Sequence, residues 1–265
     1  METLHIAVDA RGVARVTMTR PEVFNAFNEQ MIGELDQAFE RLTADPKVRV
    51  IVLAGAGKAF SAGADIQWMQ RAAQASQEWN LQDARRFAAM LYRIQSCPKP
   101  TIARVQGVAL GGGVGLTAAC DIAVASLDAR FAVSEARFGI LPAVIGPYVV
   151  NAVGSRQARR LALTGSRIPA SEALALGLVH EVAAPDALDE ALERWLTELL
   201  ANGPQAQAEI KQLLGQLAVG AVTEEVRELT AQTISRVRVG EEAREGFAAF
   251  MAKRPAAWVP QGEGA

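Results

Sequence analysis

The first half of the chain alternates between short apolar runs and segments in which apolar residues recur at helical spacing. Residues 4–8 and 13–18 predict two strands joined by a polar turn. After Asn28, a typical N-cap residue, apolar side chains fall on one helical face until Pro46. The branched and uninterrupted apolar run at residues 48–55 predicts a buried strand.

The same alternation continues beyond residue 60. Residues 66–71 predict a short helix, and Ser76 caps a longer helix that ends before Pro98. Residues 101–110 predict a strand that a glycine cluster turns into a helix at residues 114–119.

Two further strands are predicted at residues 121–126 and 130–135, and the pattern is nearly all helical from Pro147 onward. The pair Gly203 and Pro204 separates two of these helices. Strands and helices that alternate with short crossovers predict an α/β fold, here followed by a helical C-terminal part.

Composition narrows the function classes. The chain has 265 residues, of which 50% are hydrophobic, so it can bury one large core. A net charge of −2 without a basic stripe argues against nucleic-acid binding. Two cysteines, Cys97 and Cys120, are too few for a disulfide framework. The charged N-terminus does not have the pattern of a signal sequence, and no apolar run reaches the length of a membrane span. We therefore expect a cytoplasmic protein with no nucleic-acid or membrane partner.

Several familiar motifs fail on their spacing. Residues 55–58 lack the earlier glycine and the following Ser or Thr of a phosphate-binding loop. Residues 111–115 lack the third glycine of a dinucleotide fingerprint, and Ser61 lacks the first glycine of a nucleophile elbow. His5 and His180 have no metal-ligand spacing, so no metal site is expected.

Two glycine turns, "SAGADI" and "ALGGGVGL", each lead from a strand into a helix, and Glu135 ends a nearby predicted strand. The first turn of a helix presents unpaired backbone N–H groups. If two such ends converge, they form an oxyanion hole that stabilises a carbonyl as it becomes an enolate. On this pattern alone, purely structural turns are the more common alternative.

Five segments of the chain resemble the crotonase superfamily of enoyl-CoA hydratases and isomerases. They are "RPEVFNAFN", "KAFSAGADI", "GVALGGGVGLTAACDIAVAS", "FAVSEARFGILP" and "FAAFMAKR", in that order. The resemblance implies a spiral of ββα turns over residues 1–200, and a helical region at residues 201–265 that forms trimers or dimers of trimers. It also implies an acyl-CoA substrate and no cofactor beyond the CoA moiety.

The resemblance assigns residue roles as well. The oxyanion N–H groups are those of Ala64 and Gly112, and Glu135 is the acid/base. Contacts with the CoA moiety are implied for Phe24, Lys58, Ala62, Asp65, Ile66, Phe250 and Lys253, the last two commonly in a neighbouring subunit. Solvation of Lys58 and simple packing of Phe24 and Phe250 are the alternatives.

The chain departs from the best-known hydratases at Gly115, where they carry a second glutamate. One carboxylate, Glu135, can in principle serve either hydration of a 2-enoyl thioester or a double-bond shift from 3-enoyl to 2-enoyl. An apolar pocket would raise the pKa of this glutamate, which suits a proton shuttle.

"GGGVGL" together with the region after residue 137 resembles hydratases of 3-methylglutaconyl-CoA in leucine breakdown and of isohexenylglutaconyl-CoA in acyclic terpene breakdown. The resemblance implies a hydratase (a carbon–oxygen lyase) for a β-branched, carboxylated 2-enoyl-CoA. We expect Gly115 to leave room beside Cβ and to remove a charge that would repel the substrate carboxylate. Arg137 is a candidate cation for that carboxylate, with surface solvation the alternative.

The sequence also offers candidate residues for the acyl pocket and leaves several alternative functions open. Candidate pocket residues, each with a core role as its alternative, are Trp68, Met69, Trp79, Phe87 and Met90. Other functions left open are a 3-enoyl to 2-enoyl-CoA isomerase, a general enoyl-CoA hydratase, a CoA-binding protein without turnover and an RNA-binding protein. The presence of Glu135 argues against a CoA-binding protein without turnover. The acidic net charge argues against an RNA-binding protein.

Overall fold

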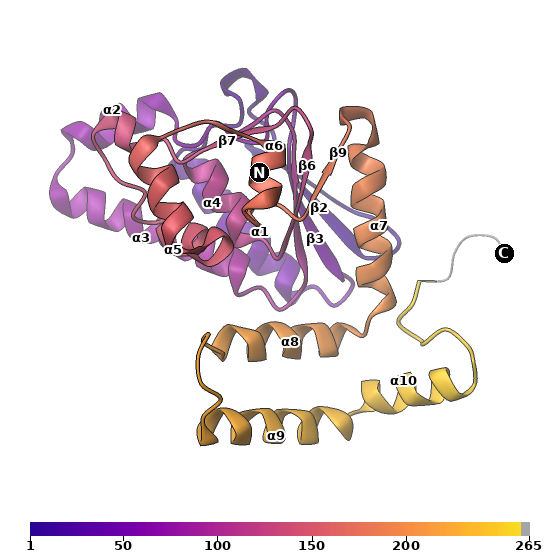
Figure 1. Cartoon of the computed structure of the whole chain (residues 1–265). Coiled ribbons are helices and arrows are strands. Elements are labelled where there is room, and N and C mark those ends of the chain that lie inside the picture. Colours follow the sequence, from indigo (N-terminus) through magenta and orange to yellow (C-terminus); the bar gives the residue numbers. More distant parts are fainter. Residues whose placement is uncertain (261–265) are drawn as a thin grey trace.

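A computed structural model describes residues 1–260, in which the strands form two sheets (Figure 1). The larger sheet has the order β1-β2-β3-β4-β6-β9, and only its β1–β2 pair is antiparallel. Its strands are β1 (Leu4–Val8), β2 (Val13–Met18), β3 (Val50–Gly55), β4 (Thr101–Val105), β6 (Ile122–Ser126) and β9 (Glu181–Ala183). The smaller sheet contains β5 (Val108–Leu110), β7 (Arg130–Ala132) and β8 (Ile168–Pro169), in that order.

Helices cover both faces of the larger sheet. In chain order they are α1 (Glu29–Ala44), α2 (Ile66–Gln74), α3 (Gln77–Gln95), α4 (Gly112–Ala119), α5 (Gly146–Thr164), α6 (Ala170–Ala175), α7 (Leu188–Ala201), α8 (Pro204–Gln216), α9 (Glu224–Arg238) and α10 (Glu241–Met251). Three single turns of 3-10 helix add η1 (Pro21–Val23), η2 (Glu135–Phe138) and η3 (Pro185–Ala187).

The apolar patterning determines which helix lies on which face. Figure 1 shows α7 alone on one side of the sheet, with α1, α3, α4 and α5 on the other. Leu188, Leu192 and Leu196 of α7 are buried against Val50 and Val52 of β3. Both predicted N-caps are confirmed, because Asn28 accepts a hydrogen bond from the N–H of Met31 and Ser76 accepts one from Trp79. The α/β class with ββα turns is also confirmed.

Two predicted strands differ from the structure. Residues 101–110 form β4 and β5 in different sheets, because the chain turns at Gly107 (φ +64°), where a Cβ would overlap the carbonyl of Lys58. The strand predicted at residues 130–135 ends at Ala132, and Glu135 instead begins η2. The all-helical prediction after Pro147 missed β8 and β9, which are two and three residues long and too short for a periodic pattern.

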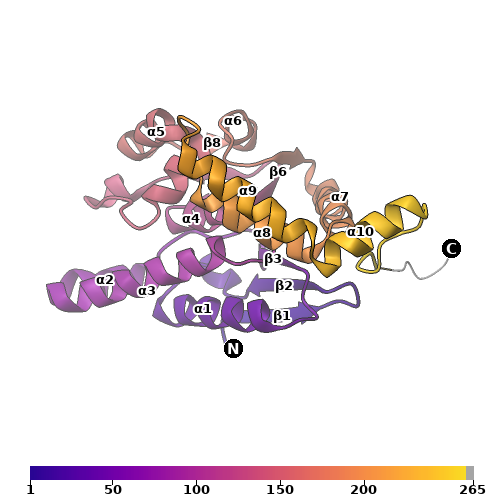
Figure 2. The same ribbon diagram turned by 90° about the horizontal axis from the view of Figure 1, so that it is seen from below.

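The C-terminal helices α8, α9 and α10 form a layer below the α/β core in Figure 1, and this layer lies in front of the core when the molecule is seen from below in Figure 2. An ion pair of 2.5 Å between Lys211 of α8 and Asp121 joins this layer to the core. The predicted helical region at residues 201–265 is helical as far as Met251, and its last five residues lie outside the described part of the chain. No helix within residues 1–260 is long and apolar enough to cross a membrane.

Candidate active site

The glycine turn "ALGGGVGL" places the N–H of Gly112 at a helix start. Strand β5 enters α4 through Gly111, whose φ of +50° and ψ of −118° are unfavourable for other residues. Gly112 is the first residue of α4, so its N–H has no partner within the helix. Within residues 1–260 this N–H makes no other hydrogen bond either.

The second turn brings an N–H of Ala64 to the same place. Phe27 and Ala64 form a parallel bridge in which the N–H of Phe27 donates to Gly63 (2.8 Å) and that of Asp65 donates to Phe27 (3.0 Å). The N–H of Ala64 is left out of this ladder and has no acceptor in the described chain. Gly63 (φ +85°) lies against the other turn, because a Cβ there would lie 3.4 Å from the nitrogen of Gly112.

Glu135 lies beside these two donors. A Cβ at Gly111 would lie 3.2 Å from its Oε1, so the carboxylate lies over the glycine turn. Its Oε2 is buried and, among residues 1–260, has no hydrogen-bond partner. Burial raises the pKa of Glu135 above its usual 4.5 and outweighs the backbone hydrogen bonds that lower it. The arrangement supplies a proton acceptor next to an oxyanion hole.

Two cavities meet at this point. The outer one has a volume of about 700 Å³ and the inner one about 240 Å³. Ala64, Gly112 and Glu135 line both of them. A ligand that extends from one cavity into the other therefore passes between the two N–H donors and the carboxylate.

The inner cavity is mainly apolar and aromatic. The rings of Phe27, Trp68 and Phe87 form its packed wall, with centroids 5.2 to 6.4 Å apart. Of the five predicted pocket residues, Trp68, Met69 and Phe87 line this cavity. The expectation that Trp79 and Met90 line the acyl pocket is wrong. Met90 is fully buried in the hydrophobic core, and Trp79 packs against that core.

The outer cavity contains most of the residues predicted to bind CoA. Phe24, Ala62, Asp65 and Ile66 all line it. Lys58 is exposed and lines neither cavity. Phe250 and Lys253 are also exposed, on and just after α10, in the layer below the core (Figure 1). The CoA contacts of these three residues stay predictions.

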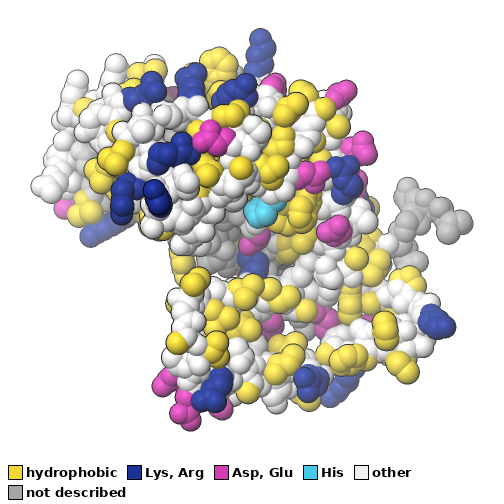
Figure 3. All heavy atoms as spheres, viewed as in Figure 1, with side chains coloured by type: hydrophobic (Ala, Val, Ile, Leu, Met, Phe, Trp, Pro, Cys, Tyr) yellow, Lys and Arg dark blue, Asp and Glu magenta, His cyan; other side chains and the backbone are white. Residues whose placement is uncertain are grey.

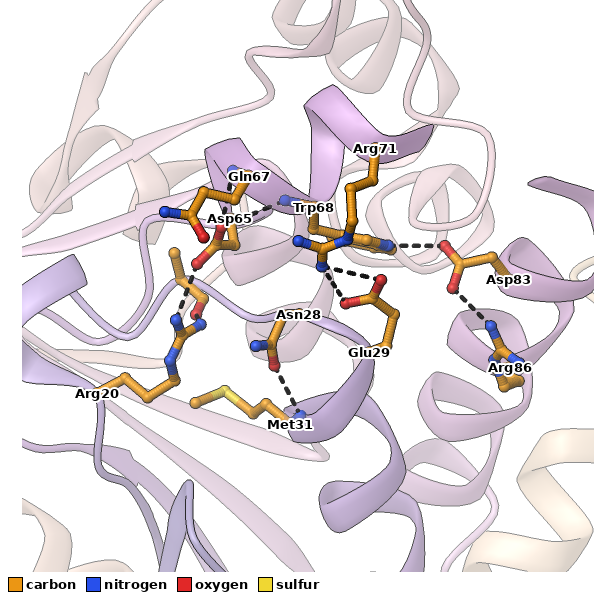
Figure 4. Close-up of polar contacts among 11 residues, drawn as sticks. Arg20, Asn28, Glu29, Met31, Asp65, Gln67, Trp68, Arg71, Asp83 and Arg86 are labelled. Carbon is orange, nitrogen blue, oxygen red and sulfur yellow. Dashed lines mark hydrogen bonds and ion pairs between the residues drawn. The ribbon is translucent and has the colours of Figure 1, made fainter. Parts of the chain in front are cut away.

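Asp65 joins the two cavities through a polar network that Figure 4 shows. It caps α2 by accepting from the N–H groups of Gln67 (2.8 Å) and Trp68 (3.3 Å), and it pairs with Arg20 (2.9 Å). Burial raises the pKa of Asp65, but these hydrogen bonds outweigh it and hold the pKa below its usual value. The side chain of Asp65 is therefore occupied in holding α2 and Arg20 at the edge of the outer cavity.

The same network reaches the inner cavity at Asp83, a residue that the sequence pattern did not single out. Asp83 accepts hydrogen bonds from Trp68 Nε1 (3.0 Å) and from Arg86 (3.0 Å) (Figure 4). It is buried and lines the inner cavity. Its position on the buried face of α3 was the available sequence signal, because a lone acid at an otherwise apolar helical position needs a partner.

The expectation that Gly115 leaves room beside Cβ of a substrate is wrong. A Cβ at residue 115 would overlap Ile145 Cγ2 and lie 2.9 Å from Ile145 Cβ. Ile145 lines the inner cavity, so an apolar side chain fills the place above Gly115. That the missing charge favours a carboxylated substrate stays a prediction.

Arg137 lines the outer cavity and is fixed there, because its Nε donates to the carbonyl of Gly165 (3.1 Å). Arg167, a residue that the sequence pattern missed, also lines this cavity. His180 lines neither cavity, and its Nδ1 accepts from the N–H of Ala123 (3.1 Å) near the start of β6. Within residues 1–260, no three His, Cys, Asp or Glu side chains come together to hold a metal.

Comparisons with known proteins agree with this geometry. The enoyl-CoA hydratase/isomerase family matches residues 9–261. The short-chain-enoyl-CoA hydratase of Clostridium acetobutylicum is 32% identical over 261 residues, covering 96% of this chain and 97% of the relative. The trans-2-decenoyl-[acyl-carrier-protein] isomerase of Streptococcus mutans is 29% identical over 248 residues, covering 92% and 93%.

A solved structure is similar over nearly the whole chain. The enoyl-CoA hydratase of Shewanella pealeana superposes with a TM-score of 0.93 at 41% identity, covering 97% of this chain and 96% of that structure. Family, relatives and fold therefore agree over almost all of the sequence. This chain belongs to the enoyl-CoA hydratase/isomerase family of enzymes.

Proposed function

We propose that the protein adds water across the 2,3 double bond of a 2-enoyl-CoA thioester. The observation that carries this proposal is the junction of the two cavities. There, among residues 1–260, two N–H groups without an acceptor lie beside a buried carboxylate oxygen without a partner. The thioester carbonyl would accept from Ala64 and Gly112, with CoA in the outer cavity and the apolar arm of the acyl group in the inner one.

The chemistry then needs one carboxylate. Glu135 takes a proton from water while the water oxygen bonds to Cβ, and the electrons of the double bond move to the thioester oxygen. The two N–H donors stabilise the resulting enolate. Glu135 next gives its proton to Cα, the carbonyl re-forms, and the carboxylate returns to its first state. A raised pKa suits both halves of this cycle.

For the acyl group we propose a β-branched, carboxylated chain such as 3-methylglutaconyl or isohexenylglutaconyl. The two cavities differ in charge in a way that supports this class. The charged residues lining the inner cavity are Asp83 and Glu135, both acidic, so it suits an apolar arm. In the outer cavity Arg20 is paired with Asp65, whereas Arg137 and Arg167 are available for a carboxylate arm.

A panel of thioesters tests this choice. Crotonyl-CoA, 3-methylcrotonyl-CoA and 3-methylglutaconyl-CoA differ by the branch and then by the carboxylate, and loss of the enoyl absorbance measures hydration. We expect the highest kcat/KM for 3-methylglutaconyl-CoA. The highest value for crotonyl-CoA would instead make the protein a general enoyl-CoA hydratase.

A 3-enoyl to 2-enoyl isomerase is the second candidate. The specific observation in its favour is the single carboxylate at the cavity junction, with Ile145 above Gly115. Isomerisation needs only removal and return of a proton, which Glu135 alone can do. Uptake of oxygen from labelled water into the product separates the two, because hydration incorporates it and isomerisation does not.

We also propose that the protein assembles as a homotrimer or a dimer of trimers through residues 201–265. Hydrophobic side chains are exposed along α8–α10, including Ile210, Leu214 and Phe247 (Figure 3). Such a surface is typical of an interface. Light scattering should give three or six times the chain mass of 28.2 kDa, and the mass of a single chain would contradict assembly.

A further inference from the structure

We infer that Ile145 determines which acyl groups the inner cavity accepts, and that residue 115 is a glycine because Ile145 occupies the space above it. This inference rests on the proposed function only in taking the inner cavity as the acyl pocket. It adds a specificity-determining pair, one residue inside α4 and one immediately before α5, to the groups that act on the thioester.

Ile145 has a defined position between the core and the cavity. It precedes the first residue of α5 and its carbonyl accepts from the N–H of Val149 (3.1 Å). Only 2% of its surface is exposed, yet it lines the inner cavity together with Gly112 and Glu135. Its side chain therefore forms the cavity wall close to where Cα and Cβ of a substrate react.

Gly115 is explained by this side chain and not by its own backbone. Its φ lies outside the left-handed region, so α4 does not require a glycine there. Glycine inside a helix costs about 1 kcal/mol relative to alanine. A Cβ at residue 115 would overlap Ile145 Cγ2, and Leu91 Cδ1 would lie 3.7 Å from it.

The core offers Ile145 no room to retreat. Leu91 is fully buried, and both residues belong to the main hydrophobic core. A methyl group at residue 115 would therefore push Ile145 toward the inner cavity, which is the open side. Substitutions at residues 115 and 145 should thus change the cavity in opposite directions.

The test compares Ile145→Ala, Gly115→Ala and the double variant on crotonyl-CoA and 3-methylcrotonyl-CoA. Removing three carbons from the wall should raise the ratio of kcat/KM for the branched over the unbranched substrate about tenfold or more. Gly115→Ala should lower this ratio, and the double variant should return it toward or above the wild-type value. Leu161→Ala is the matched control, because Leu161 lies on α5, is equally buried (2% exposed) and lines neither cavity.

Leu161→Ala should lower Tm without changing the ratio. An unchanged ratio in folded Ile145→Ala and Gly115→Ala would overturn the inference. If the wild type hydrates neither of these thioesters nor 3-methylglutaconyl-CoA, the proposed function fails separately, and the same variants are compared by Kd for butyryl-CoA and 3-methylbutyryl-CoA. Ile145→Ala should then favour the branched ligand about tenfold, and equal ratios of Kd in wild type and variants would refute the pair.

Discussion

Replacing Gly112 with alanine tests whether its N–H and its missing side chain both matter. The added Cβ would overlap Phe27 Cζ and lie 2.9 and 3.1 Å from Cε1 and Cε2 of the same ring. Because Gly112 begins α4 beside Glu135, any relief of this overlap moves the proposed oxyanion donor.

The size of the effect follows from how tightly the ring is held. Phe27 is fully buried, and its centroid lies 5.2 Å from Phe87 and 6.1 Å from Trp68. The ring is therefore held on the side of these two neighbours, and overpacking of this kind costs about 1–3 kcal/mol in unfolding free energy. Loss of one oxyanion donor costs about 100- to 1,000-fold in kcat.

Steady-state hydration of a 2-enoyl-CoA and urea denaturation measure the two effects. Gly33→Ala is the control, because a Cβ there has no atom within 4 Å and Gly33 lies inside α1. It should leave kcat unchanged and add about 0.5–1 kcal/mol of stability. Gly112→Ala with wild-type kcat and stability would refute both the steric reasoning and the donor assignment.

Three more variants test the network around the site. Because the pKa of Glu135 is raised in the folded state, the stability that its carboxyl group contributes is complete below the usual pKa of 4.5 and is lost as pH rises through the raised pKa. Urea denaturation should therefore show the unfolding free energy of Glu135→Gln gaining on that of the wild type over this interval, and a constant difference would contradict this reasoning. Asp65→Ala should lower the free energy of unfolding by about 1–3 kcal/mol in the same assay, because α2 loses its N-cap and Arg20 loses its ion-pair partner. An unchanged denaturation midpoint would exclude a stabilising role for Asp65. Arg137→Gln should raise KM about 10- to 100-fold for 3-methylglutaconyl-CoA but not for crotonyl-CoA, and equal changes for both would dismiss Arg137 as the carboxylate anchor.

Local chemistry made much of the fold predictable. Apolar spacing marked α1, and the side chains of Asn28 and Ser76 act as the caps that their positions predicted. The two glycine turns do lie together, because Gly63 and Gly111 adopt positive φ at the ends of adjacent segments. Each of these features depends on neighbouring residues in the chain, which a sequence pattern can show.

Features that depend on distant residues could not be predicted in this way. The turn at Gly107 follows from its contact with Lys58, almost fifty residues earlier, and it separates β4 from β5. Ile145 fills the space above Gly115 only because α4 and α5 pack together. The charge difference between the two cavities likewise depends on α3, which brings Asp83 to the inner one.

The rate of hydration by Glu135→Gln tests the central claim most directly, because this variant keeps the shape of the side chain and removes its acid/base function. Binding of butyryl-CoA measures whether the site is intact. The account predicts a fall in kcat of about 100- to 10,000-fold with an unchanged Kd for butyryl-CoA. A variant that hydrates 2-enoyl-CoA at nearly the wild-type rate would contradict the assignment of Glu135 as the single acid/base.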